Sequence, residues 1–196
     1  MKPRHTATAL ALAVSAGVAG AQCVPQWIPM PQSQWLDDEV KSMTVWNPGP
    51  RATPLLIAGG NFFHGGGTSM TLVGAWDGAH WAAMGEGLPG SGLCLTTHDP
   101  DGSGLEPEQL FVGSVGLSLN GQPISSPARW TGSTWQAIGG GISGGTLIEV
   151  RTIAFAKGSL FIGGVFEMVG GVPAHRCAYW RNNQWRAADP RWQNSG

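Results

Sequence analysis

The hexapeptide Trp76-Asp77-Gly78-Ala79-His80-Trp81 indicates the fold class, because its frame of two tryptophans separated by four residues returns twice. The later copies are Trp130-Thr131-Gly132-Ser133-Thr134-Trp135 and Trp180-Arg181-Asn182-Asn183-Gln184-Trp185. Turn-forming residues between two short runs predict a β-hairpin, and this spacing is expected to set the two indoles opposite each other across it. Such a cross-strand aromatic pair stabilises a hairpin by roughly 0.2–1 kcal/mol. The sequence therefore predicts an all-β repeat protein.

The repeat extends upstream of the tryptophans. Residues 59–81, 113–135 and 163–185 align without a gap, with shifts of 54 and then 50 residues. The match extends upstream through an apolar strand that ends in small residues, at 56–60, 110–114 and 160–164. Gly67, Gly121 and Gly171 coincide in the alignment, which predicts a turn with positive φ between this strand and the first tryptophan.

Each unit opens with one more short strand, at 40–46, 93–98 and 150–155. Four strands in a unit of about 50 residues are typical of a propeller blade. We therefore expect one repeat domain over 22–196, with three four-stranded antiparallel blades in units at about 27–80, 81–134 and 135–185. The segment Trp27–Met30 repeats Trp81–Met84 and is expected to be a spare amino-terminal strand.

Residues 1–21 have the pattern of a secretory signal peptide. Lys2 and Arg4 form a basic start, an apolar stretch follows, and Ala19-Gly20-Ala21 offers a small-residue cleavage site. The apolar stretch is too short for a membrane span, and no later run approaches the roughly 20 apolar residues that a span needs. The mature chain is expected to be exported, to the periplasm, the cell surface or the exterior.

Composition narrows the class of partner. The 31 glycines, 14 prolines and 10 tryptophans beside 12% charged residues favour short strands and tight turns. A net charge of −1 gives no electrostatic basis for binding nucleic acid or an anionic membrane. An exported chain can form disulfides, but Cys23, Cys94 and Cys177 are an odd set, so one of them must stay free or pair outside the chain. Cys94 and Cys177 do not belong to the repeat, and we expect small buried side chains there.

The third unit carries a recognisable repeat pattern. Leu160-Phe161-Ile162-Gly163-Gly164-Val165-Phe166 is followed by Gly170-Gly171-Val172-Pro173-Ala174 and then by Ala178-Tyr179-Trp180 and Trp185. This resembles the kelch-like propeller repeats of exported bacterial proteins and the related repeats of fungal cortical proteins that mark cell polarity. The resemblance covers roughly residues 27–189 and implies a β-propeller with surface or interaction roles. Closed propellers usually have at least four blades, so three blades leave open a complete ring, a piece of a larger one, or half of an assembly.

Candidate ligand-binding residues lie outside the recurring positions. The repeated tryptophans are expected to pack between blades, whereas Trp35, Trp46 and Trp192 fall outside those columns and are candidates for a binding surface. Asp99 and Asp101 sit in an acidic, glycine-containing loop that resembles a calcium loop. We expect a solvated turn there rather than a calcium site, because the matching loop of the first unit, 47–50, has no carboxylate. No cofactor or metal site is expected.

The sequence gives little support for catalysis. The histidines of the mature chain occupy different repeat positions without metal-ligand spacing, and no Gly-x-Ser-x-Gly nucleophile elbow is present. A copper oxidase of the galactose oxidase kind is disfavoured because Tyr179 is the single tyrosine. We therefore expect a non-enzymatic binding module with a protein or glycan ligand. The alternatives are a glycan-active hydrolase or lyase, and a structural fragment of a larger repeat protein that is stable only when it pairs with a second copy or a neighbouring chain. Because three blades leave two outer blade faces uncovered, we also expect self-association that completes a ring.

Overall fold

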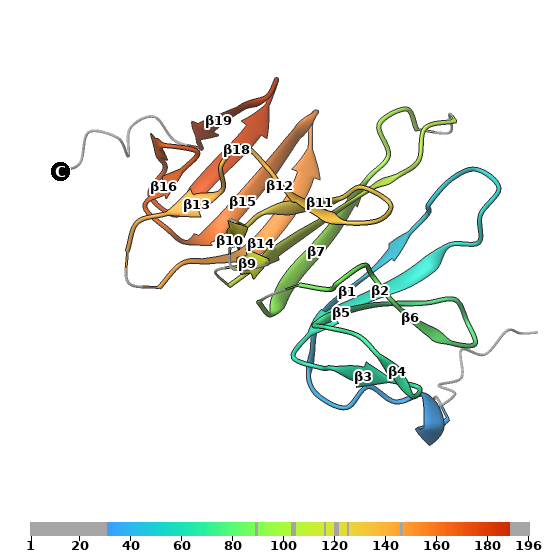
Figure 1. Cartoon of the computed structure of the whole chain (residues 1–196). Helices are drawn as coiled ribbons and strands as arrows, with labels where there is room; N and C mark the ends of the chain where they lie inside the picture. Colours follow the sequence, from blue (N-terminus) through green and yellow to red (C-terminus); the bar gives the residue numbers. More distant parts are fainter. Residues whose placement is uncertain are drawn as a thin grey trace, which may run out of the picture.

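The computed structural model describes residues 31–188 except 89, 103–104, 116, 120–121, 125 and 146. The expected signal peptide, the expected spare strand at 27–30, Cys23 and Trp192 lie outside these residues. The described chain is all-β with a single short 3₁₀ turn, η1 (Gln32–Gln34), and contains no α-helix. Three four-stranded antiparallel sheets dominate it (Figure 1).

The three sheets repeat one topology, in which each strand pairs with its neighbour along the meander. The first contains β1 (Val40–Trp46), β2 (Leu55–Gly60), β5 (Val73–Trp76) and β6 (Trp81–Ala83). The second contains β7 (Gly92–His98), β8 (Gln109–Ser114), β11 (Ala128–Trp130) and β12 (Trp135–Ala137). The third contains β14 (Glu149–Ala156), β15 (Ser159–Val165), β18 (Cys177–Arg181) and β19 (Gln184–Ala187).

The sheets begin and end at positions that differ from the expected units at 27–80, 81–134 and 135–185. Those boundaries separate the two tryptophans of a hairpin, whereas each sheet keeps both of them. The reason is local, because the strands on either side of the short turn are paired with each other. The first two strands of each sheet also share a β-bulge, between Val40 and Ser42, Gly92 and Cys94, and Val150 and Thr152.

Small hairpins join the second and third strands of the sheets. They are β3 (His64–Gly65) with β4 (Thr68–Ser69), β9 (Leu117–Leu119) with β10 (Gln122–Ile124), and β16 (Met168–Val169) with β17 (Val172–Pro173), to which β13 (Ile142–Ser143) adds a strand. The predicted positive-φ turns are confirmed at Gly67 (φ 81°) and Gly171 (φ 79°). Gly121 lies outside the described residues.

The predicted tryptophan pairs are confirmed in all three sheets. Trp76 pairs with Trp81, Trp130 with Trp135 and Trp180 with Trp185 as direct cross-strand partners. Their ring centroids lie 5.4, 5.2 and 5.2 Å apart with tilted planes. The second member of each pair is buried and the first is half-buried, so the pair links the outer hairpin to the core.

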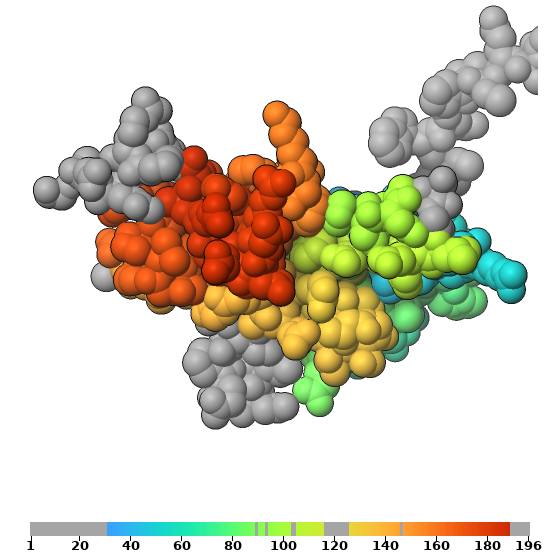
Figure 2. Space-filling view, turned by 90° about the horizontal axis from the view of Figure 1, so that it is seen from above, coloured from blue at the N-terminus to red at the C-terminus, as the bar shows by residue number. Residues whose placement is uncertain are grey.

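The sheets stack face to face in chain order, with the first strands of the sheets as neighbours. β7 contacts both β1 and β14, and Figure 1 shows it lying between them. One apolar cluster joins Ile57 and Val73 of the first sheet to Leu110 and Val112 of the second, and the other joins Phe111 of the second sheet to buried residues of the third. Figure 2 shows the third sheet, in orange and red, lying against the yellow outer strands of the second.

An amino-terminal strap, defined here as residues 32–37, covers part of the first sheet. Leu36 forms a β-bridge with Gly65, and the indole N–H of Trp81 donates to the Gln34 carbonyl at 2.8 Å. The Asp37 carboxylate accepts the backbone N–H groups of Phe63 and His64 at 2.8 and 2.9 Å, and it lies 2.9 Å from the His64 ring. The β-bridge and these hydrogen bonds therefore hold the strap on the β3–β4 hairpin.

The two described cysteines do not pair with each other. The Cys94 thiol lies 3.6 Å from the Val150 carbonyl, between the second and third sheets, and burial raises its pKa to about 12. Cys177 is half-buried, and burial raises its pKa as well. For Cys94, the expectation of a small side chain inside the packing is confirmed.

Candidate ligand-binding site

A cleft of about 510 Å³ lies between the second and third sheets. One wall comes from β8, β11 and β12, and the other from the β14–β15 and β18–β19 hairpins. The structure brings these segments together only through the stacking of the two sheets, because they are far apart in the sequence. Its lining is aromatic at the base and polar at the rim.

The aromatic base is formed by Phe111, Phe155 and Trp180. Phe155 lies with its ring centroid 6.0 Å from that of Phe111 and stacks on the His98 ring, with centroids 3.5 Å apart and planes within 10°. His98 ends β7 and Phe155 lies near the end of β14, so this stack joins the two sheets. Phe155 and Trp180 are half-buried, which leaves part of each ring available to a ligand.

The rim carries two guanidinium groups, from Arg129 on β11 and Arg181 at the end of β18. Amide side chains accompany them, from Gln109, Gln136 and Asn183. The cleft has no carboxylate among its lining residues, and neither arginine forms an ion pair within the described part of the chain. The rim therefore presents uncompensated positive charge beside planar hydrogen-bonding groups.

Local backbone geometry fixes the third-sheet wall. Asn182 and Asn183 have φ of 51° and 57°, the conformation that a two-residue hairpin turn requires and that asparagine tolerates. Gly139 has φ +56°, and a Cβ there would meet the rings of Trp180 and Trp185. The missing side chain lets Trp180 lie against the exit of the second sheet.

The arginine and the glutamine of the second-sheet wall have no counterparts in the first sheet. In matching registers, the pair Arg129–Gln136 corresponds to Ala75–Ala82. The position of Phe155 in β14 likewise corresponds to Thr97 in β7, since each pairs with the leucine that is second in the following strand. Arg129 and Gln136 are thus additions to the repeat rather than parts of its framework.

A smaller acidic cleft of about 250 Å³ lies between the loops that follow β1 and β7, lined in part by Asp99, Glu106 and Glu108. Glu108 Oε2 accepts the Asn47 backbone N–H at 2.7 Å, and Asp99 Oδ1 accepts that of Asp101 at 3.2 Å. Asp101 Oδ2 accepts the Glu106 N–H at 3.0 Å, and this bond lowers the pKa of Asp101. Several of these carboxylates therefore shape the loops. No group of three or more His, Cys, Asp or Glu side chains that could hold a metal ion occurs among the described residues.

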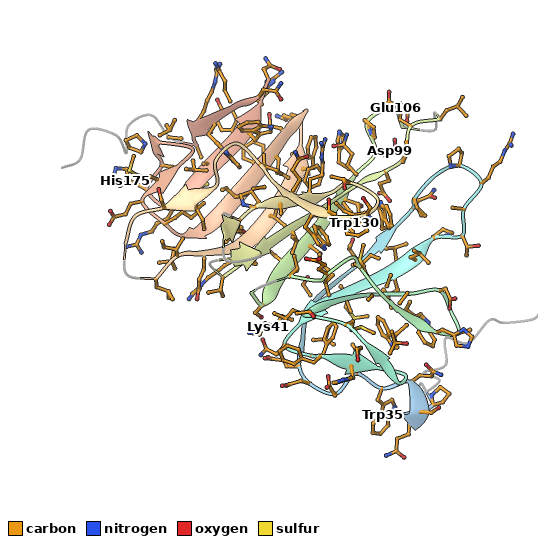
Figure 3. The ribbon with its side chains drawn as sticks, viewed as in Figure 1. Trp35, Lys41, Asp99, Glu106, Trp130 and His175 are labelled. Carbon is orange, nitrogen blue, oxygen red and sulfur yellow. The ribbon has the colours of Figure 1, made fainter. Side chains whose placement is uncertain are left out.

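The four site residues expected from the sequence do not meet in one place. Trp35 is 57% exposed, and Figure 3 shows it on the opposite side of the molecule from Asp99 and Glu106. Trp46 is half-buried, packs against the core between the first two sheets and donates its indole N–H to the Glu108 carbonyl at 2.6 Å. Asp99 lines the acidic cleft, and Asp101 braces its loop.

Sequence reasoning missed the residues of the larger cleft. The available signal was the repeat alignment itself, in which Arg129 and Gln136 stand where the first unit has alanines. A column that changes from alanine to a charged side chain marks a surface that packing does not dictate. The alignment cannot say which sheet faces that column, so it could not join these residues to Phe155 and Trp180.

No protein-family model, no curated protein and no solved structure matches this chain. Within the described residues, no helix combines the length and the apolar character needed to cross a bilayer.

Proposed function

We propose that this chain is an exported, non-enzymatic binding module built as part of a β-propeller, and that it binds an anionic saccharide in the cleft between its second and third sheets. The observation that carries the proposal is the pairing of two arginines without ionic partners, Arg129 and Arg181, with half-buried aromatic rings in one cleft. Export rests on the signal-peptide pattern of residues 1–21.

The propeller assignment is supported by three features that the sheets share. Each is a four-stranded antiparallel meander, successive sheets stack face to face, and their first strands are neighbours. Propeller blades have this strand order, with the first strand nearest the axis. The kelch-like pattern of residues 160–185 agrees with the assignment, and the three sheets form an open set rather than a closed ring.

The chemistry of the cleft favours a carboxylated sugar. A guanidinium group binds a carboxylate through two parallel hydrogen bonds, and the amides of Gln136 and Asn183 can both donate and accept hydrogen bonds, as sugar hydroxyls require. The ring faces of Phe155 and Trp180 offer flat apolar surface for the C–H face of a sugar ring. The same groups would leave a neutral, fully apolar ligand without partners for the arginines.

A glycan-active hydrolase is supported less well. Glycoside hydrolysis uses a pair of carboxyl groups flanking the scissile bond, and no carboxylate lines the larger cleft. In the acidic cleft, Asp99 accepts a backbone hydrogen bond within its own loop, and Glu108 accepts one from Asn47 in the loop that follows β1. Binding without turnover is therefore the function that the geometry supports best.

The test is calorimetric titration with a short oligosaccharide of uronic acid units, compared with the neutral oligosaccharide in which the carboxylates have been reduced to alcohols. We expect the acidic form alone to bind. R129A and R181A should each weaken binding about tenfold or more, because a hydrogen bond to a charged group contributes about 1.5–3 kcal/mol. R51A removes the same charge from an exposed loop outside the cleft and is the matched control.

Equal binding of both sugars, or equal losses in R51A and R129A, would overturn the site assignment. Incubation with the same oligosaccharides under saturating conditions tests the enzymatic alternative. Cleavage that disappears in E108Q or D99N would replace the binding proposal with a hydrolase located at the acidic cleft.

A further inference from the structure

Strand β1 presents an apolar face that nothing in the described chain covers. Val40, Met43 and Val45 are 38, 53 and 60% exposed, and they stand on the face of the first sheet turned away from the second. Isolated apolar side chains are common on protein surfaces, but a row of three on one strand marks an association site.

The internal repeat shows what covers this face elsewhere. The shared β-bulges align Val40 with Val150 and Met43 with Ile153 in the third sheet. There Val150 is 0% and Ile153 8% exposed, because the second sheet packs on them. The exposed row on β1 thus lies on the face that, in the second and third sheets, is covered by the preceding sheet.

The third sheet ends the stack with the complementary surface. Phe161 occupies the register position that Phe111 has in the second sheet, and Phe111 is only 4% exposed because it lies in the core shared with the third sheet, close to Phe155. Phe161 is half-buried and packs sideways on Tyr179, with ring centroids 5.5 Å apart. Nothing in the described chain covers it from the following side.

The strap closes only one part of the uncovered first sheet. The Trp81 indole donates to the Gln34 carbonyl, and the Trp185 indole donates to the Ile138 carbonyl, each 47 residues earlier in the chain. The strap thus takes the place that the exit of the second sheet has against the third. It supplies the outer contact but no sheet to lie over Met43 and Val45, so a partner for them has to come from elsewhere.

We propose that the chain associates head to tail, with the free face of the third sheet of one copy packed on the free face of β1 in the next. Phe161 of one copy then meets Val45 of the other, as Phe111 meets Phe155 inside the chain. Such a contact joins two different surfaces, and it produces a closed ring where the rotation between copies permits it. It is independent of the saccharide cleft, which lies within one copy.

The test measures the mass of the purified full chain by light scattering after size exclusion at micromolar concentration. The parent chain should be a dimer or larger. M43D and F161D each carry one damaged face, and each alone should run as a monomer. An equimolar mixture of the two retains one intact pair of faces and should form a complex of two chains. L105D, at a loop residue 83% exposed, should leave the mass unchanged.

Mixing the two variants distinguishes head-to-tail association from other modes of association. A monomeric parent chain overturns the proposal, and the reason for which β1 stays without a second copy does not change that result. Association that survives F161D but not M43D indicates that two β1 faces meet each other, which also overturns it. Circular dichroism of both variants verifies that they are folded, as expected for substitutions at exposed or half-exposed side chains.

Discussion

The indole N–H groups of Trp81 and Trp135 provide a matched test of how the tryptophans hold the sheets. The two side chains are 5 and 6% exposed, and each pairs with a first tryptophan at nearly the same distance. Trp81 donates to the Gln34 carbonyl at 2.8 Å, whereas the buried Trp135 N–H has no acceptor among the residues that the structure describes. Replacement by phenylalanine removes a similar amount of apolar surface from each site but changes the hydrogen bonding in opposite directions.

The difference between the two variants follows from these partners. W81F loses a hydrogen bond with a net value of about 0.5–1.5 kcal/mol, while W135F removes a buried donor whose desolvation costs about 1–3 kcal/mol. W81F should therefore lower the free energy of unfolding by at least about 1 kcal/mol more than W135F does. Urea denaturation followed by circular dichroism measures this difference without dependence on tryptophan emission. Equal destabilisation, or greater loss in W135F, would refute the hydrogen-bond assignment.

Two further predictions concern the strap and the cleft wall. Hydrogen bonds from the His64 backbone, the His64 ring and the Phe63 backbone lower the pKa of Asp37 from 3.8 to about 2. The hydrogen bonds by which the Asp37 carboxylate holds the strap are therefore present above about pH 4 and are lost as the pH falls toward 2. NMR shifts of the Phe63 and His64 amides should titrate over that window in the parent chain and stay flat in D37N. G139A should lower the free energy of unfolding by about 1–3 kcal/mol more than G158A does, because of overpacking. Both glycines have positive φ, but only a Cβ at Gly139 meets tryptophan rings. Thermal unfolding of the two variants compares them, and equal losses of stability would contradict the packing seen at Trp180.

The tryptophan hairpins were predictable because every contact that defines them is local. Trp76 and Trp81 are separated by one turn, so the spacing alone sets their register, and the three copies support one another. The same holds for the turns at Gly67 and Gly171, where positive φ is a property of the residue and its neighbour. Strand order within a sheet followed from the same short connections.

Trp46 shows where such reasoning stops. It lies outside the recurring tryptophan columns, which makes it a candidate for a binding surface, and it occupies the position in β1 that His98 occupies in β7, opposite the first residue of the next strand. Both side chains reach the following sheet, Trp46 through the Glu108 carbonyl and His98 through the Phe155 ring. The contact with the following sheet recurs in both sheets, whereas the residue type differs. An alignment based on residue identity therefore cannot detect it.

The separation between framework and site explains how a repeat protein can carry a polar cleft between two of its sheets. Near β1, β7 and β14 the sheets touch closely, and a Cβ on Gly113 would meet the Val150 side chain, so that position has no room for a larger residue. Toward β11 and β12 the sheets leave room between them, and Arg129 and Gln136 are exposed there. Exposed side chains of this kind change stability by little when replaced. The arginine variants should therefore lose saccharide affinity while the free energy of unfolding stays within about 0.5 kcal/mol of the parent value, so a loss of binding in them reports on the cleft rather than on the fold.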